Sequence, residues 1–198
     1  MGRLRAQRSG QKSLRRLACL ALFATTGCVL FQPPPAPPLP EWPALEVSHF
    51  GEMQNVSMSE RLWFGGGVTE PDIELAFRRG VKRVLDLSFQ ADEFNFDLKL
   101  ACESHGIELI DAGLNDAESL SGADADLTLE IFRDVDSRPL LVLCEAGSNS
   151  AAFFALWRVL DHEMPLDLAL DEARRAGMRP GVLEGYVLAQ HERLKEDD

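Results

Sequence analysis

One cysteine of the chain stands where a strand ends and a short glycine-containing loop begins. Residues 139–144 read Pro-Leu-Leu-Val-Leu-Cys, a continuous apolar run that is typical of a strand covered on both faces. A helical pattern starts at Ala151, so Cys144 lies between a buried strand and the N-terminus of a helix. The positive end of that helix favours the thiolate, which is the nucleophilic form of cysteine. These residues therefore predict a cysteine nucleophile.

The loop after this cysteine has the composition of an anion cradle. It joins a strand to a helix, which is where an α/β sheet places its ligand site. Free backbone N–H groups at a helix start point toward such a ligand, and glycine lets the backbone turn tightly around it. We expect the loop to bind phosphate while the thiolate attacks a phosphate ester. The predicted phosphate-binding residues are Glu145, Ala146, Gly147, Ser148, Asn149 and Ser150.

Cys144 also has two plainer interpretations. Free cysteine is among the most buried residue types, so a packed thiol at a strand end is one alternative. Cys102 lies in a helical pattern, and an exported protein meets an oxidising compartment, so a Cys102–Cys144 disulfide is the other. None of the four histidines stands at a spacing from either cysteine that is typical of a metal site. These histidines are His49, His105, His162 and His191. We therefore expect no metal and no cofactor.

Short apolar runs alternate with helical patterns from about residue 60 onward. Two helix starts carry a hydroxyl residue followed three positions later by an acid, at Thr69 and at Ser121. Strands alternating with helices predict an α/β fold, with a mostly parallel sheet of about four to five strands flanked by helices. The expected strands cover 61–64, 81–87, 107–110 and 139–144, a turn covers 65–67, and the expected helices cover 69–80, 93–105, 121–135, 151–161, 166–176 and 181–196.

The first 45 residues are predicted to be an export signal and a tether. A basic stretch and a short apolar run are typical of a secretory signal peptide over residues 1–27. Gly27-Cys28 resembles the lipobox of bacterial lipoproteins, although Thr25 stands where that family has leucine. Cleavage near Gly27 without lipidation, or an uncleaved anchor, is the alternative. We expect an exported lipoprotein, anchored to a bacterial membrane through Cys28 on its periplasmic or surface side.

Residues 28–45 are rich in proline and favour an extended spacer over a ligand for proline-binding modules. The folded domain is expected over residues 46–198. The chain has 20 Lys+Arg against 32 Asp+Glu, and removing the six basic residues of positions 1–27 leaves 14 against 32. A body this acidic repels polyanions, so we expect no nucleic-acid partner. After the signal segment, no apolar run is long enough to span a bilayer.

Residues from about 56 to 190 resemble the bacterial branch of the cysteine-dependent protein tyrosine and dual-specificity phosphatases. The similarity rests on the order of the elements, on the Leu-Val-Leu-Cys-x-x-Gly run into a helix, and on the stretch from Met164 to Gly177. It implies a phosphatase-like fold in which Cys144 forms a phosphocysteine. It also implies a ligand that is a phosphate monoester or a phosphoprotein.

The resemblance further implies an aspartate that protonates the leaving oxygen, on a loop upstream of the cysteine. Asp116 follows the third expected strand, as the family's acid does, and is the candidate. A solvated loop acid is the alternative interpretation of this residue. Asp111 and Asp86, near strand ends, are weaker candidates for the same role.

The family signature is damaged in this chain. The family has histidine before the cysteine and arginine five or six residues after it, whereas here Leu143 precedes the cysteine and Asn149 and Ser150 follow. The arginine binds two phosphate oxygens and stabilises the transition state, so its loss should cost roughly two decades or more in rate. Asn149 could donate one neutral hydrogen bond instead. Glu145 opposes phosphate if its side chain points inward.

These departures predict a catalytically impaired phosphatase-like domain that acts in binding or scaffolding. The alternative is an active cysteine-dependent phosphatase that hydrolyses phosphate monoesters through a phosphocysteine. Sulfur transfer of the rhodanese type, with a persulfide on the loop cysteine, ranks last because that family also favours a basic loop.

Overall fold

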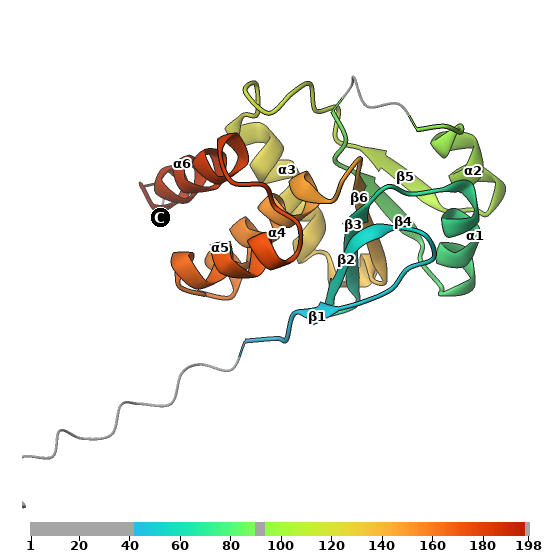
Figure 1. Ribbon diagram of the computed structural model, residues 1–198, viewed down its shortest axis with the longest axis horizontal. Helices are drawn as coiled ribbons and strands as arrows, with labels where there is room; N and C mark the ends of the chain where they lie inside the picture. The colour runs from blue at the N-terminus through green and yellow to red at the C-terminus, as the bar shows by residue number, and fades with distance from the viewer. Residues whose placement is uncertain (1–41, 90–93, 197–198) are drawn as a thin grey trace, which may run out of the picture. The chain divides into compact units, whose positions relative to one another are not determined.

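The computed structural model describes residues 42–89 and 94–196 (Figure 1). The predicted signal peptide, the lipidation site at Cys28 and most of the proline-rich tether lie outside the described residues. The described residues all belong to one compact unit.

Six strands form one sheet in the order β1-β2-β3-β6-β4-β5. The four strands from β3 to β5 in this order run parallel, whereas β1 and β2 pair antiparallel. The expected α/β class and mostly parallel sheet are therefore confirmed. The strands are β1 (Glu46–Val47), β2 (Gln54–Ser59), β3 (Leu62–Gly66), β4 (Arg83–Asp86), β5 (Glu108–Asp111) and β6 (Leu140–Cys144).

The hairpin that joins β2 to β3 extends the sheet beyond the expected strands. Its two-residue turn is Glu60-Arg61, and both residues have positive φ, 49° and 64°. Turns of this kind usually contain Asn-Gly or Asp-Gly, so this pair gave no hairpin signal in the sequence. β2 reads Gln-Asn-Val-Ser-Met-Ser, and its two apolar residues are too few to establish a period of two.

Helices cover both faces of the sheet (Figure 1): α1 and α2 lie on one face, and α3 to α6 lie on the other. β6 lies between β3 and β4, and its side chains alternate between the two layers. Leu141 and Leu143 pack with α1 and α2, whereas Val142 and Cys144 pack with the other helices. The helices are α1 (Glu70–Arg78), α2 (Leu98–Ser104), α3 (Gly122–Arg133), α4 (Ser148–Asp161), α5 (Leu166–Arg175) and α6 (Val182–Glu196).

The two predicted capping signals are confirmed. The Asp72 carboxylate accepts the Thr69 backbone N–H at 2.8 Å, and the Asp124 carboxylate accepts that of Ser121 at 2.7 Å. These contacts satisfy backbone donors that would otherwise lack a partner at the starts of α1 and α3. None of the helices among the described residues is both long enough and apolar enough to cross a membrane.

Two helix starts differ from the expected ones. α2 begins at Leu98, because the Asp97 side chain caps it by accepting the Leu100 backbone N–H at 2.9 Å. α4 begins at Ser148, three residues before the expected start at Ala151. The polar run 148–150 looks like loop in the sequence, but it forms the first turn of this helix. Half of the predicted phosphate-binding residues are therefore helical.

Candidate functional site

Cys144 is the last residue of β6, an inner strand of the sheet, at the side of the sheet where the carboxyl ends of the parallel strands lie. Its side chain is buried, with 2% of the residue exposed. The Gly147 backbone N–H donates to its Sγ at 3.1 Å, and the Ser150 hydroxyl lies 3.4 Å from the same sulfur. Gly147 has φ of +83°, a left-handed conformation that lets the loop fold back over Sγ. A backbone donor of the loop and a hydroxyl of α4 therefore contact the sulfur of the predicted nucleophile.

A pocket of about 290 Å³ opens above this cysteine. The loop and the first turn of α4 contribute part of its lining, and the α5–α6 connection and the start of α6 contribute another part. Phe89, which follows β4, completes the rim. The lining residues are Phe89, Cys144, Glu145, Ala146, Ser148, Asn149, Arg179, Pro180, Val182 and Leu183. The structure thus brings most of the predicted phosphate-binding residues to one cavity.

The polar side chains of the first turn of α4 bind backbone groups. Ser148 Oγ accepts the Arg179 backbone N–H at 2.8 Å. Asn149 Nδ2 donates to the Leu87 carbonyl oxygen at 2.8 Å. One of the two Asn149 amide N–H donors is therefore used within the protein, and donation to phosphate in place of arginine stays a prediction for the other.

Ser150 stands six residues after the cysteine, at the second of the two positions considered for the family arginine. Its side chain is fully buried, and its hydroxyl lies 3.2 Å from the Gly65 carbonyl oxygen as well as 3.4 Å from Cys144 Sγ. This is the position whose side chain faces the sulfur, whereas the Asn149 side chain binds Leu87. A neutral hydroxyl therefore occupies the place beside the predicted nucleophile.

The three glycines 65–67 contact the loop that follows Cys144. The expectation of a plain turn at 65–67 is wrong, because β3 extends to Gly66. Gly66 forms an antiparallel bridge with Ala146, and the Gly67 backbone N–H donates to the Glu145 carbonyl oxygen at 2.6 Å. A Cβ on Gly66 would lie 2.1 Å from the Gly147 nitrogen. Only glycine allows so close an approach of two backbones. The signal for this role was a run of glycines ending an apolar strand.

The Glu145 side chain does not carry a buried charge beside the predicted nucleophile. Its side chain is exposed at the rim of the pocket, and among the described residues its carboxylate has no hydrogen-bond or ion-pair partner. The charge is therefore solvated, which weakens its repulsion of a bound anion without removing it.

Asp116 is exposed and is not among the described residues that line the pocket. Its carboxylate accepts the Ser119 backbone N–H at 2.8 Å, and its backbone N–H binds the Ser119 hydroxyl at 3.2 Å. The structure therefore does not bring the predicted general acid to Cys144, because the carboxylate closes a local turn. Asp111 and Asp86 likewise accept backbone N–H groups two residues ahead, at 2.8 and 2.9 Å.

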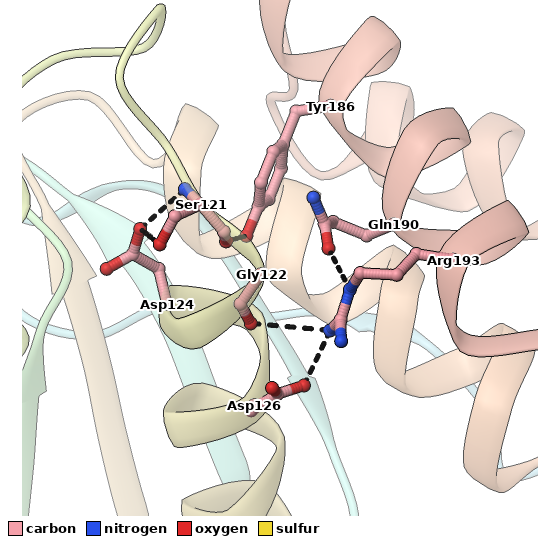
Figure 2. Close-up of polar contacts among 7 residues, drawn as sticks. All are labelled: Ser121, Gly122, Asp124, Asp126, Tyr186, Gln190 and Arg193. Atoms are coloured by element: carbon pink, nitrogen blue, oxygen red, sulfur yellow. Dashed lines mark hydrogen bonds and ion pairs between the residues drawn. The ribbon is translucent and has the colours of Figure 1, made fainter. Parts of the chain in front are cut away.

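A cluster of polar contacts fixes the wall that α6 contributes to the pocket (Figure 2). The Tyr186 hydroxyl donates to the Ser121 carbonyl oxygen at 2.8 Å, and burial raises the pKa of Tyr186, so this donor stays protonated. Arg193 donates to Asp126 at 2.6 Å and to the Gly122 carbonyl oxygen at 3.3 Å. These contacts hold α6 against the start of α3.

The two described cysteines are both free thiols, so the disulfide alternative is wrong. Cys102 packs in the layer of α1 and α2, whereas Cys144 packs in the layer of α3 to α6. Because β6 alternates its side chains, the sheet separates the two sulfurs. Burial, with a smaller contribution from the Asp86 charge, raises the pKa of Cys102 to about 11. Cys102 is therefore protonated and unreactive.

Within residues 42–89 and 94–196, no group of three or more potential metal ligands lies together. Two of the histidines instead pack against aromatic rings: His105 stacks on Phe77 with centroids 5.3 Å apart, and His162 lies edge-on to Trp157 at 4.4 Å. Both histidine rings therefore contribute to packing.

Several solved structures share this fold at low sequence identity. The core catalytic domain of the PP-IP phosphatase SIW14 from S. cerevisiae, in complex with citrate, is 18% identical with a TM-score of 0.59, covering 73% of this chain and 93% of that chain. Tk-PTP in the active form is 19% identical with a TM-score of 0.57, covering 77% and 99%. TpbA from P. aeruginosa is 18% identical with a TM-score of 0.54, covering 74% and 96%.

A family model described as a DSP-PTPase phosphatase fused to NAD+ kinase matches residues 34–187. No curated protein sequence matches the chain. The family match covers well over half of the chain and confirms the resemblance to tyrosine and dual-specificity phosphatases. The chain therefore belongs to this family of DSP-PTPase phosphatase domains.

Proposed function

We propose that the domain binds a phosphate monoester in the pocket above Cys144 and turns it over slowly or not at all. The observation that carries this proposal is Ser150, whose buried hydroxyl lies 3.4 Å from Cys144 Sγ where the family signature has arginine. A hydroxyl cannot bind two phosphate oxygens as a guanidinium does, nor offset the charge of phosphoryl transfer. Its substitution is expected to cost about a hundredfold or more in rate.

The position of Asp116 supports impaired catalysis independently. A general acid must lie within hydrogen-bond reach of the leaving oxygen, directly or through one water. The Asp116 carboxylate is exposed and bound to Ser119, away from the pocket lining. Loss of general acid catalysis typically costs a further factor of about 10²–10⁴.

Binding is supported by what remains of the site. The amide-rich start of α4 faces a pocket whose volume, about 290 Å³, suits a small ligand. TpbA has been solved in complex with pTyr and PTPMT1 in complex with PI(5)P, and both share this fold at TM-scores of 0.51 and 0.54. A phosphate monoester is therefore the ligand class that we propose here.

An assay of the full-length chain with an aryl phosphate under reducing conditions tests the proposal. We expect binding of the aryl phosphate without turnover, and turnover at least about a hundredfold higher in Ser150→Arg. Asn149→Arg is the matched control, because its side chain is directed to Leu87 and not to the sulfur. Turnover by the unchanged chain that Cys144→Ser abolishes would instead establish the alternative, an active phosphatase. Failure to bind any aryl phosphate would overturn the proposal.

We further propose that the domain is exported and anchored through a lipid on Cys28. Gly27-Cys28 after a short apolar run supports this location. Metabolic labelling with a radioactive fatty acid tests it in a bacterial host. Label in the parent chain and none in Cys28→Ser is expected, whereas an unlabelled chain cleaved near Gly27 would contradict lipidation.

A further inference from the structure

We propose that Arg179, in the connection between α5 and α6, supplies the cation that binds the ligand's phosphate group in the Cys144 pocket. It would replace, from a different segment of the chain, the positive charge that is missing beside the sulfur. This inference rests on the proposed function, because it assigns a binding residue to the same site.

Arg179 is the one cationic side chain among the described residues that line the pocket. It belongs to the connection between α5 and α6, and the neighbouring Pro180, Val182 and Leu183 line the same pocket. The other charge in the lining is Glu145, which is negative and solvated. An anion in this pocket would therefore have a single cationic side chain to bind.

The guanidinium of Arg179 has no hydrogen-bond or ion-pair partner among the described residues. Two other arginines of this part of the chain differ from it: Arg174 binds Asp171 and Glu184, both at 2.6 Å, and Arg193 binds Asp126 at 2.6 Å (Figure 2). The chain holds 32 acidic residues against 20 basic ones, so carboxylates are abundant. An arginine that is left without a carboxylate at a pocket is available to an anionic ligand.

The backbone beneath this side chain is fixed to the loop. The Arg179 backbone N–H donates to Ser148 Oγ at 2.8 Å, which ties it to the first residue of α4. Gly177, two residues earlier, packs against Asn55, and the Asn55 amide in turn donates to the Ala146 carbonyl oxygen at 2.9 Å. Pro180 restricts the residue before it to extended conformations. The backbone of Arg179 is therefore fixed beside the loop before a ligand arrives, so that binding has to order only the exposed side chain.

The chemistry of the pocket suits a phosphate on an apolar group. A guanidinium presents two parallel N–H donors that match two phosphate oxygens. Free backbone N–H groups at the start of α4 would donate to the same phosphate. Phe89, Val182 and Leu183 would then contact the apolar part of the ligand.

Titration of the full-length chain with phenyl phosphate, followed by the amide resonances of Gly147 and Ser148, tests this role. We expect Arg179→Gln to raise the Kd for phenyl phosphate about tenfold or more, since a hydrogen bond to a charged group is lost. Arg175→Gln is the matched control, because it removes an equal charge from an exposed arginine of α5 that does not line this pocket. We expect it to change the Kd less than about twofold.

Two further measurements separate charge from shape. Phenol, which lacks the phosphate, should bind Arg179→Gln and the parent chain equally. Glu145→Gln should tighten phenyl phosphate binding, because it removes the opposing charge at the rim. If the parent chain binds phenyl phosphate and Arg179→Gln binds it equally well, the inference about Arg179 is wrong while the proposed function stands. If the parent chain shows no binding at all, the proposed function fails and the inference fails with it.

Discussion

The two ends of helix α4 use charge in opposite ways. Near its C-terminal end, Arg158 is 1% exposed and binds Glu172 at 2.9 Å and the Pro43 carbonyl oxygen at 2.5 Å. At its N-terminal end, neutral side chains hold the surrounding backbone, and the two charges of the pocket, Glu145 and Arg179, have no partner among the described residues.

This difference separates the residues that hold the fold from those that are available to a ligand. A buried charge must be paired, because its desolvation is otherwise uncompensated. A charge at an open pocket stays hydrated, and a ligand can take the place of that water. Substitutions at the C-terminal end should therefore change the free energy of unfolding, and substitutions at the N-terminal end should change ligand binding more than stability.

Arg158→Met should have the largest effect on stability. It leaves Glu172 as a nearly buried carboxylate without its partner, which is expected to cost about 3–5 kcal/mol of unfolding free energy. Urea denaturation measures this loss. The double variant with Glu172→Leu should recover most of it, because no unpaired charge remains. A loss below about 1 kcal/mol would contradict the division between the two ends of α4.

Gly66→Ala tests the contact between β3 and the loop before the N-terminal end of α4. The new Cβ would lie 2.1 Å from the Gly147 nitrogen, so the loop must move, at a cost of about 1–3 kcal/mol and with weaker phenyl phosphate binding. Gly185→Ala in α6 is the matched control, since nothing lies within 4 Å of its Cβ. That change should stabilise the helix by about 0.5–1 kcal/mol. Unchanged ligand binding in Gly66→Ala would show that the loop does not depend on this contact.

Trp42→Ala tests how the chain enters the domain. The Trp42 indole N–H donates to the His162 carbonyl oxygen at 2.9 Å, and the half-buried ring packs on the larger apolar cluster. We expect a loss of about 2 kcal/mol from burial and hydrogen bonding together. Trp42→Phe should lose about 1 kcal/mol, because it keeps most of the ring contact. Phenyl phosphate binding should stay the same in both, and a weaker affinity would link this end of α4 to the pocket.

The site could be predicted from sequence only as far as local signals reach. Cys144 was found because an apolar strand and a helical pattern flank it, and the starts of α1 and α3 because their capping signals are local. Asp116 is the candidate acid because it follows the third expected strand, and that place in the element order does not say that its carboxylate binds Ser119. Arg179 gave no signal, since its place at the pocket depends on how α5 and α6 pack.

His162→Gln should have the smallest effect, seen only as a change in pH dependence. Burial, followed by the charges of Arg158 and Arg138, lowers the pKa of His162 against the raising effect of Glu60 and Asp161. Its Nε2 is buried without a hydrogen-bond partner among the described residues. Below a pH of about 6.5, the unfolded chain takes up a proton that the folded chain does not, so stability is lost as the pH falls toward the folded pKa.

Unfolding free energies measured at several pH values between neutral and mildly acidic should therefore fall less steeply in His162→Gln than in the parent chain. Burial also lowers the pKa of His191, so His191→Gln should remove a separate part of the same slope. In the double variant, the two reductions of the pH slope should add. His162 caps the C-terminal end of α4 and His191 lies within α6, so the two rings are expected to titrate independently. An unchanged slope in His162→Gln would mean that this ring accepts a proton in the folded protein, and that the C-terminal end of α4 tolerates a further charge.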